Sequence, residues 1–162
     1  MEAQEKIVRA IRRLQPQVVV TFGPEGGYGH PDHKAIHRFA TEAFHAAGDP
    51  ARFPHQSREG LAPFAPERLY YGSLAPRSVL KRASRELKKR GVDMGWNVID
   101  MEKMGDEDAL VTTRVDVRRF SALKLKALLA HRTQMPGGKP FRNLPDDMLD
   151  GFLGREYFLR VH

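Results

Sequence analysis

The residues best suited to chemistry lie together in one short segment, from Gly26 to His37. Two histidines and a carboxylate within one helical turn suit zinc, which accepts imidazole nitrogen and carboxylate oxygen. The positive end of a helix dipole disfavours a protonated imidazole, and so favours the neutral ring that binds metal. The side chains of this segment that can bind metal or move protons are His30, Asp32, His33 and His37.

A purely structural reading of the same residues is also open. In it, Asp32 stabilises the first turn of a helix, His30 lies near the cap and His33 has no special role. Two other readings fail on the sequence. His33 and His37 have the spacing of a zincin histidine pair, but Lys34 replaces its glutamate. Asp32 stands where the dinucleotide fingerprint needs its third glycine, which argues against a nicotinamide cofactor.

The flanking sequence predicts the elements that position this segment. Residues 2–14 have apolar side chains at helical spacing, and residues 18–22 form a β-branched run typical of a buried parallel strand. Glycines in residues 23–29 predict a loop, and Pro31 suits the first position of the next helix. The segment thus lies between a strand end and a helix N-terminus, where open α/β sheets bind ligands.

The remaining sequence continues the alternation of helix and strand, which predicts an α/β fold with a mostly parallel sheet flanked by helices. Residues 49–66 are expected to form a long surface loop. The later helix at 118–134 is expected to turn Phe120, Leu123, Leu128 and Leu129 inward. The other expected elements are a strand at 67–73, a basic helix at 76–90, a strand at 110–117, and a short helix before a strand at 156–161.

Length and composition narrow the class of protein. The 162 residues suit one domain, and 41% hydrophobic with 29% charged residues indicates a globular protein. The sequence contains no cysteine, so a metal site would have to use His, Asp or Glu. No apolar run reaches the roughly 20 residues of a membrane helix, and the N-terminus has no secretory pattern. We therefore expect a cytoplasmic protein without a membrane partner.

The net charge of +7 would permit binding to nucleic acid. Much of this charge falls on the predicted helix at 76–90, in Lys81-Arg82, Arg85 and Lys88-Lys89-Arg90. A solvated helix face explains such a run, and no interleaved aromatic residues offer a base-stacking platform. We therefore expect no nucleic-acid partner.

The segment Val18–His37, with Gly-Gly-Tyr-Gly-His-Pro-Asp-His at its centre, resembles the LmbE-like, or PIG-L, N-acetylglucosaminyl deacetylases. It looks most like the branch that acts on mycothiol precursors and conjugates. Residues 112–117, 124–134 and 156–158 resemble the later blocks of the family. The resemblance therefore covers nearly the whole chain, and implies a single domain over residues 1–162 with a Rossmann-like LmbE-type fold.

The resemblance also implies an activity, the zinc-dependent removal of acetyl from an N-acetylated amino sugar. On this comparison His33 would bind the metal, and His30 would stabilise the tetrahedral intermediate and protonate the leaving amine. Asp32 would orient a neighbouring histidine, and Tyr28 would hydrogen-bond the developing oxyanion. These roles fit hydrolysis of an amide, which needs a polarised carbonyl, a proton for the amine and donors for the oxyanion.

The sequence departs from the family in one respect. The His-Pro-Asp-Asp-Glu motif, which gives the family a His and an Asp for zinc and an Asp as general base, does not occur. We expect the chain to match the C-terminal two-thirds of the family domain, as a fragment, a product with a misassigned start, one of two complementing chains, or a degenerate product.

Three consequences of this departure are expected. The chain alone would bind zinc weakly and turn over little substrate. A shortened sheet would expose an edge and apolar surface, which favours a homo-oligomer or a complementing chain with the missing ligands. The alternative function is a non-catalytic module that binds a glycoside without hydrolysing it, and an in-frame His-Pro-Asp-Asp-Glu upstream would favour the enzyme.

Four further residues are weaker candidates for substrate binding. Gly27 would let the backbone approach a ligand closely, and Arg52 on the long loop could contact substrate. His131 and Gln134 lie three residues apart on one helix face, although a structural hydrogen bond explains them about as well. We interpret His37, one turn beyond His33, as a residue that supports the site or packs beside it.

Overall fold

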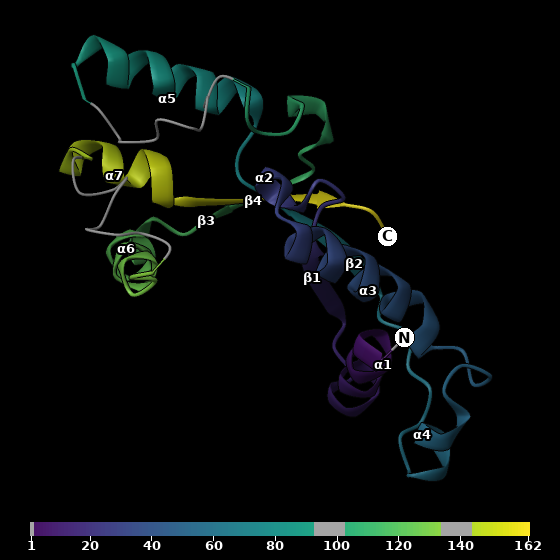
Figure 1. Ribbon diagram of the computed structural model, residues 1–162. Helices are drawn as coiled ribbons and strands as arrows, with labels where there is room; N and C mark the ends of the chain where they lie inside the picture. Colours follow the sequence, from purple (N-terminus) through teal and green to yellow (C-terminus); the bar gives the residue numbers. More distant parts are fainter. Residues whose placement is uncertain (1, 93–102, 134–143) are drawn as a thin grey trace. The chain divides into compact units, whose positions relative to one another are not determined.

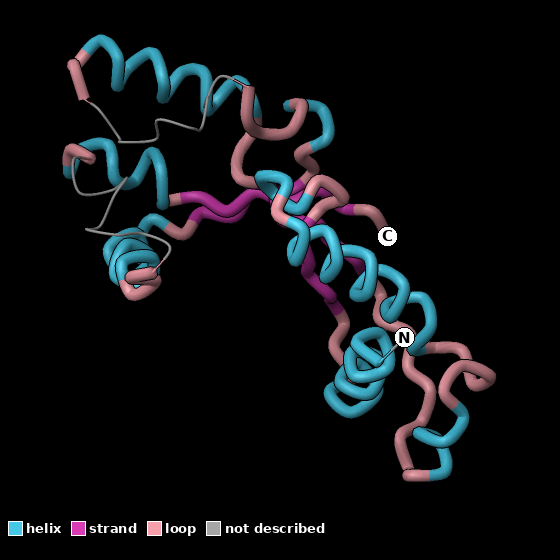
Figure 2. The backbone as a smooth tube through the Cα atoms, viewed as in Figure 1, coloured by secondary structure: helices cyan, strands magenta, loops and turns pink. Residues whose placement is uncertain are grey.

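The computed structural model describes residues 2–92, 103–133 and 144–162. The chain divides into two compact units, Met1–Gly72 with Phe158–His162, and Ser73–Tyr157. Within these described ranges, four strands lie in the order β1-β2-β4-β3, with helices beside them (Figure 1 and Figure 2). The α/β class expected from the sequence is confirmed. None of the described helices is long and apolar enough to span a membrane.

The elements follow the predicted alternation. The first unit holds α1 (Glu2–Leu14), β1 (Val18–Phe22), α2 (Gly26–Gly29), α3 (Pro31–Ala47), α4 (Pro54–Arg58), nearly all of β2 (Arg68–Ser73) and the end of β4 (Arg155–Arg160). The second holds α5 (Arg77–Lys89), η1 (Asp108–Leu110), β3 (Thr113–Asp116), η2 (Arg118–Phe120), α6 (Ser121–Leu129), α7 (Asp146–Leu153) and the start of β4.

Local signals explain the boundaries of α1 and α3. Acidic residues occupy the first turn of α1 and basic residues its last turn, which complements the helix dipole. Gln15, with φ 48°, then leaves the helix through the left-handed region. In α3, His30 is the N-cap, Pro31 takes the first position and Gly48 ends the helix.

Strand β1 connects the hydrophobic core to an open face. It pairs in parallel with β2, in the register Val19 to Leu69 and Phe22 to Gly72. Val19 packs against the core of α1 and α3, which consists of Val8, Ile11, Ala43, Ala46 and Ala47.

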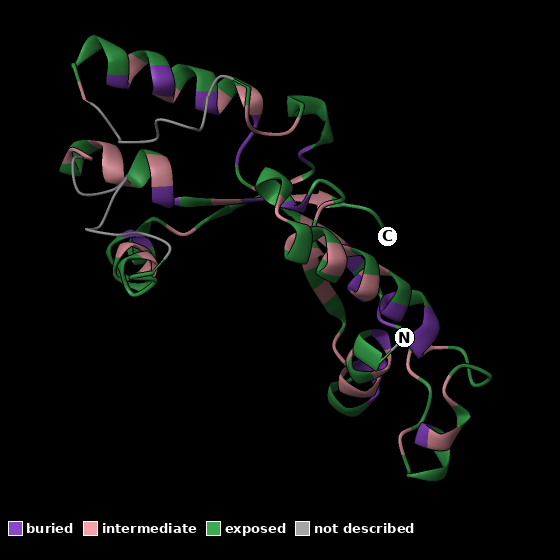
Figure 3. Cartoon of the chain, viewed as in Figure 1, coloured by how far each residue is buried: buried purple, intermediate pink, exposed green. Residues whose placement is uncertain are grey.

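The opposite face of β1 is not covered by the described residues. Val18, Val20 and Phe22 are 44%, 55% and 39% exposed, and β1 is at one end of the strand order. Figure 3 shows this contrast between β1 and the buried residues of α1 and α3. The exposed edge and apolar surface expected from the sequence are both present.

A buried arginine ties α1 to the segment that follows α3. The side chain of Arg12 is 2% exposed, and its guanidinium donates to four backbone carbonyls and one side-chain amide. Burial lowers the pKa of Arg12, but the surrounding carbonyl dipoles take the place of water around the charge. The acceptors are the carbonyls of Ala47, Asp49, Arg52 and Phe53 and the side chain of Gln56.

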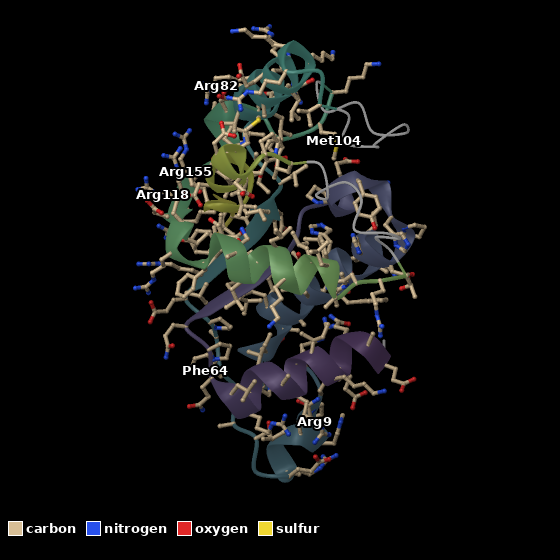
Figure 4. All side chains as sticks on the ribbon, turned by 90° about the vertical axis from the view of Figure 1, so that its left-hand side faces the viewer. Arg9, Phe64, Arg82, Met104, Arg118 and Arg155 are labelled. Carbon is tan, nitrogen blue, oxygen red and sulfur yellow. The ribbon has the colours of Figure 1, made fainter. Side chains whose placement is uncertain are left out.

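Residues 49–66 are more ordered than the surface loop expected from the sequence. They contain α4, and Gln56 within it is fully buried. Besides Arg12, the backbone carbonyl of Glu5 holds this amide, and Arg9 pairs with Glu59 just after the helix. Figure 4 shows Arg9 pointing from α1 toward this segment. The prediction failed because these stabilising contacts lie about 50 residues away along the chain.

The predicted loop at 23–29 and the inward face at 118–134 also need correction. One irregular helical turn, α2, interrupts the loop, because positive φ values at Gly26 and Gly27 allow a tight reversal. Phe120, Leu123 and Leu129 are 42%, 62% and 38% exposed, since among the described elements α6 packs mainly on α7 and η2.

The second unit carries much of the basic surface. In α5 the buried residues are Leu80, Ser84 and Leu87, so the charged positions face solvent as expected. In the β3–η2 region, Arg118 binds the carboxylate of Asp116 through its guanidinium and its backbone N–H. These contacts, with the nearby charge of Arg155, lower the pKa of Asp116 to about 2. Arg118 and Arg155 are labelled in Figure 4.

The Arg12 contacts predict a large loss of stability on truncation. Arg12→Met keeps the length and packing of the side chain but leaves buried carbonyls without donors. We expect the free energy of unfolding in urea to fall by about 3 kcal/mol. Arg12→Lys should lose less, because its ammonium can serve some of the same acceptors. The control is Arg13→Met, on the exposed side of α1, which should change stability by less than about 0.5 kcal/mol. Equal effects of the two Met variants would contradict the prediction.

Candidate active site

The candidate site is the turn that joins β1 to α3. Gly26 is buried there with φ 64°, and a Cβ on it would lie 2.9 Å from the backbone nitrogen of Lys34. Only glycine permits both this backbone conformation and this close approach. As a result, the carbonyl of Gly26 is held against the first turn of α3, beside His33.

The hydrogen bond of His33 fixes which ring nitrogen is free. Its Nδ1 lies 3.1 Å from the carbonyl oxygen of Gly26. Because a carbonyl can only accept, Nδ1 carries the hydrogen, and in the neutral ring Nε2 keeps its lone pair. Metal-binding histidines commonly have this arrangement, in which one nitrogen is held by a carbonyl and the other binds the ion. The side chain therefore fits one position of a zinc site.

His30 has the opposite arrangement. Its Nδ1 accepts a hydrogen bond of 3.2 Å from the backbone N–H of Asp32, as the N-cap of α3. Because that nitrogen uses its lone pair, the neutral ring carries its hydrogen on Nε2. His30 thus offers an N–H donor, whereas His33, three residues later, offers a lone pair. This difference matches the separate roles that the sequence resemblance implies for the two rings.

Asp32 lies where it can assist His30. One carboxylate oxygen is 3.9 Å from Nδ1 of His30, and the side chain of Asp32 is 91% exposed. Asp32 therefore lies beside the His30 ring, and the orienting role that the resemblance implies for it stays a prediction.

The aromatic rings of the site form a cluster. The ring centroids of His30 and His33 are 5.0 Å apart, and the Tyr28 ring lies 5.2 Å from His33 and 6.0 Å from His30. Tyr28 is 64% exposed. The structure therefore brings together Tyr28, His30, Asp32 and His33, with Gly27 in the same turn. Their catalytic and substrate-binding roles stay predictions.

Phe22, which the sequence did not assign to the site, contacts His33 directly, and His37, expected to support the site or pack beside it, contacts Phe22. The Phe22 ring stacks on the His33 ring, with centroids 4.1 Å apart and an interplanar angle of 11°. The carbonyl of Phe22 accepts a hydrogen bond of 2.8 Å from Nδ1 of His37. The four-residue spacing of His33 and His37 was a signal for His37, but Phe22 was expected only to be a buried strand residue.

The other predicted substrate-binding residues are not part of this cluster. Arg52 follows the far end of α3, which at ~1.5 Å per residue spans about 25 Å over its 17 residues. There it lines a separate hollow with Glu42, His45 and Asp49. His131 belongs to the second unit, and Gln134 lies outside the described residues. The substrate-binding roles of these three residues stay predictions. For Arg52, its position beyond the far end of α3 does not favour such a role.

A complete metal site is not formed within the described part of the chain. No group of three His, Asp or Glu side chains among those residues is arranged to hold an ion. His33 has the geometry of one ligand, while a catalytic zinc needs about three from the protein.

Comparisons with known proteins identify sequences similar to this chain. The PIG-L family, described as GlcNAc-PI de-N-acetylase, matches residues 1–44, which include the whole cluster. Proteins named 1D-myo-inositol 2-acetamido-2-deoxy-alpha-D-glucopyranoside deacetylase are 38% identical over 97% of this chain in Thermobispora bispora, and 36% identical over 97% in Streptomyces scabiei. This chain spans about half of each relative, 50% and 49% of their lengths.

A solved structure supports the fold. N,N'-diacetylchitobiose deacetylase from Pyrococcus horikoshii aligns with 99% of this chain, at a TM-score of 0.63 and 19% identity. The alignment covers 51% of that chain. At this level of identity the similarity concerns the fold, and it confirms the Rossmann-like LmbE-type arrangement expected from the sequence.

The crowding at Gly26 predicts a difference between two glycines of the same turn. Gly26 and Gly29 both have positive φ, but a Cβ on Gly29 would meet nothing within 4 Å. Gly29→Ala should therefore cost only the backbone strain, about 1 kcal/mol. Gly26→Ala should cost more and displace the Gly26 carbonyl from His33. Urea unfolding measures the first effect, and NMR of the His33 imidazole the second. Equal behaviour of the two variants would contradict the crowding argument.

Proposed function

We propose that this chain supplies one half of a zinc-dependent N-deacetylase site. Two findings support this: the PIG-L family of de-N-acetylases matches residues 1–44, and relatives named as deacetylases align with 97% of the chain. The substrate class is an N-acetylglucosamine conjugate, like the one in the names of the relatives. The observation that carries the proposal is the opposite hydrogen bonding of His30 and His33. It gives one ring a free lone pair and the other a free N–H.

In the proposed reaction, water adds to the amide carbonyl, the C–N bond breaks, and acetate and a free amine are released. Zinc, when bound, polarises the carbonyl and lowers the pKa of water to about 7. His33 contributes one ligand through Nε2, because Gly26 holds its other nitrogen. The N–H of His30 and the hydroxyl of Tyr28 donate to the oxygen on which negative charge develops.

The leaving amine also needs a proton, since an unprotonated amine leaves poorly. We assign this proton to His30, whose Nε2 carries a hydrogen while its Nδ1 accepts from the backbone N–H of Asp32. The Asp32 carboxylate lies 3.9 Å from Nδ1 of the same ring. We therefore assign to Asp32 the support of His30 during proton transfer.

We further propose that polypeptide outside the described residues supplies the remaining zinc ligands and the general base. Two observations support this. The described residues hold no three-ligand group, and the chain spans only about half of its relatives. The open face of β1 is the apolar surface against which such a segment, or a complementing chain, would pack.

The direct test is to join this chain to the part of the Thermobispora bispora relative that it does not match. With Zn²⁺, the joined protein should release acetate from the substrate named for that relative. His33→Ala should lower kcat/KM by at least about 100-fold, because it removes a metal ligand. The control, His45→Ala, changes an exposed histidine of the same helix and should leave the rate unchanged. Unchanged activity in His33→Ala would refute the ligand assignment, and binding without acetate release would favour a glycoside-binding module.

A second variant separates the chemistry of His30 from its structural role. In His30→Asn the side-chain amide oxygen can still cap α3, because Asn is among the preferred N-cap residues. The free energy of unfolding should therefore change by less than about 0.5 kcal/mol. The imidazole N–H is lost, so kcat of the joined protein should fall by about 100-fold or more. A variant that is fully active would show that His30 serves only as a cap.

A further inference from the structure

Phe22 is in contact with the proposed ligand His33 through its ring and with His37 through its backbone. The ring lies parallel to the imidazole, with 4.1 Å between the centroids. The carbonyl of the same residue accepts the hydrogen of Nδ1 of His37 at 2.8 Å. One residue at the end of β1 thus touches both histidines, although they lie a full turn apart on α3.

His37 and Thr41 continue this attachment along α3. The edge of the Tyr71 ring packs on the His37 ring at 4.8 Å, and the Tyr71 hydroxyl is 3.2 Å from the Thr41 hydroxyl. His33, His37 and Thr41 are each four residues apart, so they occupy one face of the helix. Each makes a hydrogen bond to β1, to β2 or to the turn that follows β1. This row fixes the rotation of α3 relative to the strand ends.

The His33 ring is consequently held in two independent ways. The Gly26 carbonyl fixes one ring nitrogen, and the Phe22 ring restricts rotation of the imidazole out of its plane. Either restraint alone would leave the imidazole some freedom to move. A hydrogen bond permits the ring to tilt, and a stacked ring permits it to slide in its own plane. Together they keep Nδ1–H on Gly26 and leave Nε2 available.

The geometry points to Phe22 and His37 as positioning residues, which hold the His33 imidazole in the orientation and tautomer that a metal ion needs. This inference rests on the proposed function, since it presumes that His33 is a ligand. Phe22 acts through its ring, and His37 acts by fixing the backbone that carries that ring. Outer contacts of this kind typically change metal affinity by about 10- to 100-fold.

The test uses the chain as it is, labelled with ¹⁵N, and reads the histidine rings by long-range ¹H–¹⁵N NMR at about pH 8, where imidazoles are neutral. His33 should be in the Nδ1–H form, and in the joined protein, where Zn²⁺ affinity is measured, added Zn²⁺ should shift its Nε2 signal. In Phe22→Leu the ring should populate both tautomers, and its affinity for Zn²⁺ should fall about 10-fold. Phe22→Tyr retains a planar ring and should behave like the unmodified chain.

His37 provides a second pair of variants. They test whether these contacts position the His33 ring even if Phe22→Leu does not fold. His37→Leu removes the donor to the Phe22 carbonyl and should change the His33 tautomer and Zn²⁺ affinity in the same direction. His37→Gln can donate from its amide and should restore them in part. The control for general destabilisation is Phe64→Leu, which changes a half-buried phenylalanine of the α1–α3 core. It should lower stability and leave the His33 signals unchanged.

The possible failures are distinguishable. If Phe22→Leu and His37→Leu lose stability like Phe64→Leu but keep the His33 tautomer and Zn²⁺ affinity, both residues only pack, and the inference is wrong. If the unmodified chain shows the Nδ1–H form but Zn²⁺ added to the joined protein leaves Nε2 of His33 unaffected, the ligand assignment in the proposed function is wrong, and the positioning role falls with it.

Discussion

A neutral imidazole has one hydrogen for two nitrogens, and the backbone at the start of α3 decides where that hydrogen lies. At His30 a backbone N–H donates to the lone pair of Nδ1, and at His33 a backbone carbonyl accepts the hydrogen on Nδ1. The same ring thereby becomes a donor in one case and a ligand in the other. The first contact is the N-cap hydrogen bond of α3, and the second exists because Gly26 adopts a positive φ and lies against the first turn of the helix.

The strand and the helix around the site, and a chain reversal between them, were predictable because their signals are local. The β-branched run before Phe22, the glycines and Pro31 each determine the backbone within a few residues. The hydrogen bonding of the histidines was not predictable in this way. It depends on which backbone group lies beside each Nδ1, and the Phe22 carbonyl and His37 are 15 residues apart in sequence.

Arg12 shows the same limit in the scaffold. It stands among other basic residues near the end of α1, where a charged residue normally faces water. Arg12 can be buried because the end of α3 and the segment after it fold back and offer oxygen acceptors to the five N–H groups of its guanidinium. These acceptors lie 35 to 44 positions further along the sequence.

The helical spacing at residues 118–134 led to the opposite error, a prediction of burial for side chains that are exposed. An apolar face predicts burial only if something packs on it, and in the described residues Leu123 stays 62% exposed.

Phe22 connects the open face of β1 to the chemistry. It is the last of three exposed apolar residues on that face, and its ring also supports His33. Electrostatic stabilisation of a transition state is strong only where water is excluded, so an active site at His33 requires that Phe22 be covered. A segment that packs on Val18 and Val20 would cover it in the same step. On the proposed function, burial of the β1 face and completion of the metal site would therefore be one event, in which hydrophobic contact energy assembles the catalytic groups.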